Sequence, residues 1–241
     1  MQYLHRYQVV ASLFILAFLL GSFNSYGQRA DRGSYNYNSF KNKQYYFGIT
    51  LGYNTSNYKV YRSEQFLLND TLGLVQSFQG PGFNLGLVTN LKVGNYFDIR
   101  FLPTLSFATR NINYGNVESN QTFDRKMDPV FIEAPLQFRF KSDIYNDMKM
   151  YIIGGVKYIF DVSSESRTKR EANLVKIAPS DFAVEFGFGC QFFFPYFILS
   201  PELKYSQGIS NTLIYNSNIT QATVLDKVIS RTFTISFHFE G

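Results

Sequence analysis

The sequence predicts an all-β protein, an eight-stranded antiparallel up-and-down transmembrane β-barrel with a cleaved N-terminal signal peptide. The first observation is a two-residue alternation, clearest over residues 130–141. There Ile132 and Phe138 fall on one strand face, and Glu133 and Arg139 fall on the other. Second, only 17% of the residues are charged, too few to cover the outside of a soluble sandwich. Third, long and short connections alternate, as in outer-membrane barrels.

The first 27 residues resemble an export signal. His5 and Arg6 form a weakly basic start, residues 9–20 are almost wholly apolar, and small residues precede Gln28. An apolar core of about twelve residues is too short to span a bilayer comfortably. We therefore expect residues 1–27 to be a signal peptide that is cleaved before Gln28. An uncleaved anchor helix is the alternative.

The mature chain divides into a short arm and a barrel. Residues 28–43 are polar and rich in Tyr, Asn, Ser and Arg, which predicts a flexible periplasmic N-terminal arm. Residues 44–241 form the predicted barrel. Its eight strands are expected at residues 44–54, 82–93, 96–111, 130–141, 150–162, 182–194, 196–207 and 230–240. Most of these segments are long enough to cross a bilayer when tilted.

The connections between these strands predict the orientation. Residues 94–95, 142–149 and 195 are short links, and the long links are residues 55–81, 112–129, 163–181 and 208–229. Outer-membrane barrels combine tight periplasmic turns with long external loops, so both termini should lie in the periplasm. Pro103, Pro135 and Pro201 interrupt three strands and should lie where a ladder hydrogen bond is absent.

The two strand faces predict a lipid surface and a filled lumen. The predicted lipid-facing residues are Phe47, Ile49, Leu51, Leu85, Leu87, Leu136, Phe138, Phe186, Phe188, Phe233, Ile235 and Phe237. The predicted lumen charge network contains Lys92, Asp98, Arg100, Glu133, Arg139, Lys157, Asp161, Glu185, Glu202 and Lys204. Eight strands enclose a space just wide enough for side chains, so these charges should interlock as a plug. A network that conducts protons or binds a ligand is the alternative.

Enzyme chemistry finds little support in the sequence. Cys190 is the single cysteine and shares the phase of an apolar face, and His238 is the one histidine outside the signal segment. We expect no catalytic, cofactor-binding or metal-binding residues and no cofactor, although a hydrolase built on the loops remains an alternative. The net charge of +5 includes no long basic run, so we expect no nucleic-acid partner. A soluble eight-stranded carrier is the competing fold.

Several strand motifs resemble the PorT family, also called SprT, of small outer-membrane β-barrels from the type IX secretion system. These motifs are the Gly-rich residues 82–92 leading into 96–105, Ile-Glu-Ala-Pro-Leu at 132–136, Gly-Gly-Val-Lys-Tyr at 154–158, and Leu-Ser-Pro-Glu-Leu-Lys-Tyr-Ser at 199–206 followed by Gly-Ile at 208–209. The same motifs are shared with the broader group of outer membrane protein β-barrel domains. Phe239 is followed by Glu240 and Gly241, a departure from the aromatic end of many outer-membrane proteins.

The resemblance implies a non-enzymatic component required for protein export by the type IX system, which secretes surface adhesins and proteases and supports gliding motility. Its partners would be outer-membrane lipid and other type IX secretion components. The alternative is a general structural or adhesive barrel that stabilises the envelope or binds ligands through its extracellular loops. Residues Asp70, Thr71 and Leu72 resemble an O-glycosylation motif on Thr71, and an unmodified loop is the alternative.

Overall fold

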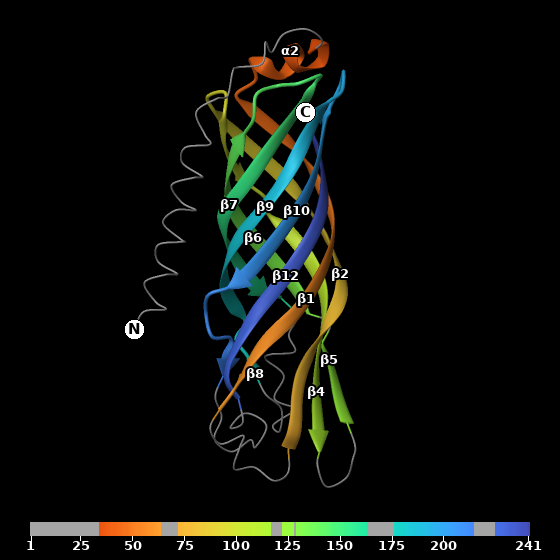
Figure 1. Ribbon diagram of the computed structural model, residues 1–241, viewed down its shortest axis with the longest axis vertical. Helices are drawn as coiled ribbons and strands as arrows, with labels where there is room; N and C mark the ends of the chain where they lie inside the picture. Colours follow the sequence, from red (N-terminus) through yellow and green to blue (C-terminus); the bar gives the residue numbers. More distant parts are fainter. Residues whose placement is uncertain (1–33, 64–71, 117–121, 128, 163–175, 215–224) are drawn as a thin grey trace, which may run out of the picture. The chain divides into compact units, whose positions relative to one another are not determined.

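The computed structural model describes residues 34–63, 72–116, 122–127, 129–162, 176–214 and 225–241. The expected signal peptide and Thr71 lie outside these residues. No helix in the described part of the chain is both long and apolar enough to cross a membrane. The structure is dominated by one antiparallel sheet (Figure 1). Its strands are β1 (Tyr45–Arg62), β2 (Leu72–Val93), β3 (Phe97–Phe101), β4 (Thr104–Asn116), β5 (Thr122–Met127), β6 (Val130–Lys141), β7 (Met148–Asp161), β9 (Ser180–Phe193), β10 (Ile198–Gly208) and β12 (Leu225–Glu240).

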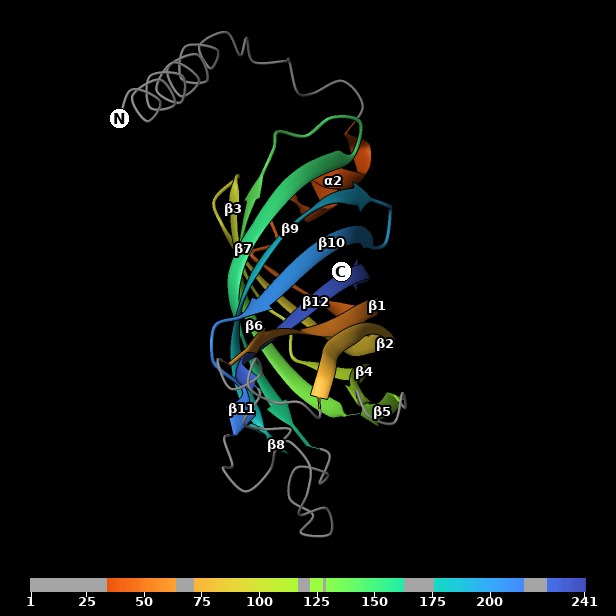
Figure 2. The same ribbon diagram turned by 60° about the horizontal axis from the view of Figure 1, so that its bottom comes forward.

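The sheet closes on itself as an eight-stranded barrel wall. β3 and β4 together form one wall strand, and β5 and β6 form another. Each remaining strand pairs with its neighbours in sequence, and β1 closes the ring by pairing with both β2 and β12 (Figure 2). A separate two-stranded sheet joins β8 (Lys176–Ile177) to β11 (Leu213–Ile214). The predicted fold class is therefore confirmed.

The two ends of the barrel differ. One end, which we call the turn end, carries the short connections at residues 94–96, 142–147 and 194–197. The other end, which we call the loop end, carries the remaining connections. At the loop end the strands run further than the sequence predicted, because β1 continues to Arg62 and β2 begins at Leu72. Much of the long connection expected at residues 55–81 is thus strand, which corrects that prediction.

The three prolines lie where the ladder is interrupted, as predicted. Pro103 occupies the break between β3 and β4, and Pro135 faces the same break, where the Leu102 N–H donates to the Pro135 carbonyl at 3.2 Å. Pro201 lies at a gap in the pairing of β10 with β9, between the pairs formed by Leu199 and Glu202. Because proline has no N–H to donate, these positions lose no hydrogen bond.

The expected flexible arm is wrong for residues 35–41, which form helix α2 (Tyr35–Lys41) at the turn end (Figure 1). Phe40 is buried in a cluster with Tyr37, Tyr46, Phe193 and Ile198. The helix is also tied down by polar contacts: the Tyr37 N–H donates to Asp147 Oδ1 at 2.9 Å, Lys149 Nζ to the Tyr37 hydroxyl at 3.2 Å, and Lys92 Nζ to the carbonyls of Phe40 at 3.2 Å and Lys41 at 2.9 Å. Burial raises the pKa of the Tyr37 hydroxyl, so this phenol stays protonated.

The outer face of the wall is apolar. All twelve predicted lipid-facing side chains point outward and are exposed, from Ile235 at 37% to Phe47 and Phe186 at 62%. Large aromatic and aliphatic side chains continue this surface around the barrel, for example Phe83 stacked on Phe107 with ring centroids 4.5 Å apart. A bilayer solvates such a surface, whereas water would not.

Gly154 and Gly155 on β7 give a test of the two faces. A Cβ at Gly155 would point inward and come within 2.5 Å of the Leu136 carbonyl oxygen, whereas a Cβ at Gly154 would meet nothing within 4 Å. We expect Gly155→Ala to lower the free energy of unfolding by about 1–3 kcal/mol through overpacking. Gly154→Ala, the matched control, should leave it unchanged. Urea titration of the barrel refolded in vesicles measures both, and equal effects would contradict the inward placement of Gly155.

Candidate functional site: the ion-pair network inside the barrel

The inward side chains near the turn end form a continuous set of ion pairs, here called the turn-side cluster. Its members are Asp98, Arg100, Arg139, Lys141, Glu202, Lys204, His238 and Glu240. Asp98 on β3 contacts Arg139 Nη2 at 2.6 Å and Lys141 Nζ at 2.6 Å. Asn90 on β2 accepts from Arg139 at 2.7 Å and donates to Asp98 at 3.1 Å. These residues come from three adjacent strands, and alternation directs all of them inward.

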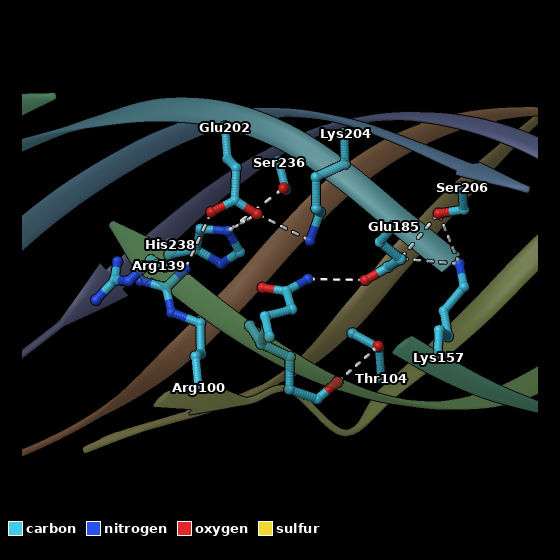
Figure 3. A network of polar contacts seen from close by, with 12 residues as sticks. Arg100, Thr104, Arg139, Lys157, Glu185, Glu202, Lys204, Ser206, Ser236 and His238 are labelled. Carbon is cyan, nitrogen blue, oxygen red and sulfur yellow. Dashed lines mark hydrogen bonds and ion pairs between the residues drawn. The ribbon is translucent and has the colours of Figure 1, made fainter. Parts of the chain in front are cut away.

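Glu202 on β10 is the most heavily contacted carboxylate in this cluster. It accepts from Arg100 Nη1 at 3.1 Å and from the Tyr151 hydroxyl at 3.0 Å, and it contacts Lys204 Nζ at 3.0 Å and His238 Nε2 at 3.4 Å. Figure 3 shows Glu202 between Lys204 and His238, with Arg100 and Arg139 close by. The Glu202 and Arg100 side chains are completely buried.

Glu240 continues the cluster toward Arg139. It pairs with the second guanidinium nitrogen of Arg100, and its carboxylate lies 3.8 Å from Arg139 Nη1. The Arg139 guanidinium also stacks over the Tyr151 ring, 4.9 Å from the centroid. Two arginines therefore share three carboxylates across the lumen, an arrangement in which each buried charge has a partner of opposite sign.

A second group lies nearer the loop end and is here called the loop-side cluster. Lys157 on β7 contacts Glu133 on β6 at 3.0 Å and Glu185 on β9 at 3.2 Å. Glu185 also accepts from Gln137 at 2.8 Å and from Ser206 at 2.8 Å, and the contact with Ser206 can be followed in Figure 3. One lysine is thus shared by two carboxylates that are further satisfied by neutral donors.

The buried charges balance within the described part of the chain. Six are basic and six are acidic: Arg100, Arg139, Lys141, Lys149, Lys157 and Lys204 against Asp98, Glu133, Asp181, Glu185, Glu202 and Glu240. Beside the loop-side cluster lies a cavity of about 20 Å³, lined in part by Thr50, Thr104, Thr234 and Ser236. A space of this size holds about one water molecule. The described interior is a filled, neutral plug.

The structure places eight of the ten predicted lumen residues in the buried interior: Asp98, Arg100, Glu133, Arg139, Lys157, Glu185, Glu202 and Lys204. The other two are only half-buried. Lys92 lies at the turn end and bonds to carbonyls of α2, while Asp161 lies at the loop-end limit of β7.

The prediction missed six members of the interior: Lys141, Lys149, Tyr151, Asp181, His238 as an ion-pair partner, and Glu240. Lys141 and Glu240 keep the inward phase of Arg139 and His238, so strict alternation could have found both. Tyr151 keeps the inward phase of Lys157 as well, but aromatic side chains were expected outside, so it was not placed in the network. Its hydroxyl reaches Glu202 because Gly189 leaves space, since a Cβ there would lie 2.7 Å from the Tyr151 hydroxyl.

Ser236, His238 and Glu202 lie close together but do not have the geometry of a catalytic triad. Ser236 Oγ and Glu202 Oε1 are each 3.4 Å from the same ring nitrogen, Nε2, whereas a triad needs the acid on the opposite nitrogen. The His238 side chain is fully buried. Among the residues that the structure describes, no group of His, Cys, Asp and Glu is arranged to hold a metal ion. The prediction that the protein is not an enzyme stays a prediction.

Three solved structures are similar to the chain at low sequence identity. Ail of Yersinia pestis, solved with the heparin analogue sucrose octasulfate, is 16% identical, with 83% of this chain and 100% of that chain covered and a TM-score of 0.36. OprG of Pseudomonas aeruginosa is 10% identical, with 82% and 95% covered and a TM-score of 0.44. Neisserial surface protein A is 10% identical, with 81% and 96% covered and a TM-score of 0.40.

No curated protein matches the sequence significantly. A family model described as "Outer membrane protein beta-barrel domain" matches residues 32–213, about three quarters of the chain. That range includes every wall strand except β12, and the structure closes the ring as this fold requires. The chain belongs to the outer membrane protein beta-barrel domain family, and it is a small barrel of the outer membrane.

Proposed function

We propose that the protein is a non-enzymatic component of type IX secretion, required for export, which acts through its outer surfaces and not as a conduit. The observation that carries this is the filled lumen. The ion pairs of the turn-side and loop-side clusters bridge the interior, and the cavity of about 20 Å³ beside them has room for about one water molecule. An exported polypeptide could not pass. The resemblance of the strand motifs to those of the PorT family supports the assignment to this pathway.

The orientation is part of this proposal. With the turn end in the periplasm, α2 and the described end of β12 face the periplasmic parts of a secretion machine, and the loop end faces outward. Tyr145 and Tyr196, in the short turns at residues 142–147 and 194–197, are 63% and 91% exposed at the turn end. Exposed aromatic residues of this kind suit protein contacts, so this rim is where we expect other secretion components to bind.

The test is a clean gene deletion with complementation, scored by extracellular cargo that carries the type IX C-terminal signal. We expect export to fail, with cargo accumulating in the periplasm, and to be restored by the wild-type gene. Complementation with Tyr145→Ala plus Tyr196→Ala should restore it poorly, whereas the matched pair Phe186→Ala plus Phe188→Ala, which faces lipid, should restore it. The purified barrel should show no steady current in a planar bilayer. Normal export in the deletion strain would leave a structural or adhesive barrel.

A further inference from the structure

Beyond the apolar belt, the outward face of β1 and β12 carries a group of cations at the loop end. We call Lys59, Lys227 and Arg231 the cationic patch. The two strands stay paired in this region, and Figure 1 shows them side by side toward the loop end. The register sets Asn57 opposite Arg231 and Tyr61 opposite Lys227.

Strand alternation decides the direction of these side chains. Lys59 keeps the phase of the exposed Tyr53 and Leu51, and Arg231 and Lys227 keep the phase of the exposed Phe233. Lys59 lies diagonally between the two others in the ladder, a separation of about 7–8 Å that long side chains can bridge. The three cations therefore share one outward surface.

Among the residues that the structure describes, no carboxylate forms an ion pair with the patch. None of its three members makes an ion pair with another described residue, and the Arg231 Nε is buried without a hydrogen-bond partner. Lys59 instead lies over the Tyr61 ring, 4.5 Å from its centroid. Like charges on neighbouring positions of a ladder are unfavourable unless an anion lies between them. The patch thus differs from the interior, where each cluster pairs its cations with carboxylates.

The height of the patch identifies the anion. Arg231 is the first outward position after Phe233, and Lys59 and Lys227 follow, so the three cover a height of about 5 to 15 Å beyond the belt for a strand tilted by about 40°. The polar headgroup layer lies at the level of Arg231, and the long side chains of Lys59 and Lys227 reach back toward it from beyond. Arginine binds phosphate with two parallel hydrogen bonds. Tyr61 adds a hydroxyl and an apolar ring beside Lys227, its partner in the register.

We propose that the cationic patch binds the phosphate of a lipid headgroup in the membrane leaflet around the loop end. The lipid is an anionic one whose acyl chains lie against Phe233 and Tyr53, while its phosphate lies among Lys59, Lys227 and Arg231. This site is independent of the export function proposed above. It fixes a lipid to the seam where β12 meets β1.

The test uses the folded full-length barrel in detergent, titrated with phosphatidylglycerol or phosphatidylcholine and read by native mass spectrometry. We expect the wild type to retain bound phosphatidylglycerol in preference to phosphatidylcholine. Lys59→Gln plus Lys227→Gln should bind phosphatidylglycerol at least about tenfold more weakly. The matched control, Lys41→Gln plus Lys43→Gln, removes two exposed lysines at the turn end and should bind as the wild type does.

Folding is checked by heat-modifiable migration on gels, so that a misfolded variant is not counted, and Arg231→Gln serves as a second variant expected to weaken binding. Equal losses in the test and control pairs would overturn the site, since they would reveal only non-specific attraction. Displacement of the lipid by excess inorganic phosphate alone would also overturn it, because the patch would then be a site for free anions and not for a headgroup.

Discussion

Glu202→Gln is expected to destabilise the barrel by about 3–5 kcal/mol, because removing one partner of a buried ion pair leaves the other charge uncompensated. The carboxylate contacts Arg100, Lys204 and His238 and accepts from Tyr151, and its side chain is wholly buried. The amide keeps the size of the side chain but removes the charge. The interior, balanced at six charges of each sign, would then carry an excess positive charge.

The measurement is the urea concentration at which the barrel unfolds in lipid vesicles, with the slope of the transition compared between variants. Ser200→Ala is the matched control. Ser200 precedes Glu202 by one inward position on β10, is equally buried, and has no hydrogen-bond partner for its hydroxyl among the described residues. We expect it to change stability by no more than about 0.5 kcal/mol. Similar losses for the two variants would mean that the network does not hold the wall together.

Phe40→Ala is expected to release helix α2 from the turn end while leaving the barrel folded. The helix has only seven residues, and a helix of that length is not stable alone in water. Its position depends on burial of Phe40, which is 3% exposed and packs on Tyr46 and Phe193 with ring centroids 6.4 and 6.1 Å away. Removing a buried phenyl ring costs about 3 kcal/mol or more, so opening of the helix should become roughly a hundredfold more frequent.

Amide hydrogen exchange across residues 35–41 measures this opening. The Tyr37 amide, which donates to Asp147, is the most informative probe. Tyr35→Ala is the control, because Tyr35 lies on the same helix but is 84% exposed and should leave exchange unchanged. Slow exchange in the Phe40→Ala variant would show that the polar contacts from Lys92 and Lys149 hold the helix without the aromatic cluster.

Alternation predicted most of the barrel correctly because each face of a wall strand meets a single environment, which is lipid on the outside and polar side chains on the inside. Where lipid lies outside and charges lie inside, as on β6, the period is unambiguous and the inward phase of Glu133 and Arg139 follows. Lys92 shows the limit of this reasoning. It keeps the inward phase, yet β2 has already reached the turn end at that point, so the side chain meets the carbonyls of α2 instead of the network.

The strand extensions and α2 could not be read from the sequence for a different reason. Beyond Asn54, β1 continues as Thr-Ser-Asn-Tyr-Lys-Val-Tyr-Arg, in which polar residues occupy both faces, because this stretch extends past the apolar belt. No period remains to be detected. Residues 35–41 are rich in Tyr and Asn, which are mediocre helix formers, so the helix owes its existence to packing on distant residues such as Phe193.

The interior ion pairs join residues that are far apart in the sequence, and this affects how the wall strands find their register. Arg100 contacts partners 102 and 140 positions away, so these contacts exist only when β3, β10 and β12 are all in place. A slip of one residue in β10 would turn Glu202 toward lipid and Leu203 toward Arg100. A misaligned strand therefore places a charge in lipid and also leaves Arg100 without its partner. We expect the barrel to assemble cooperatively for this reason. The interior ion pairs thus favour the correct strand order and register over the alternatives.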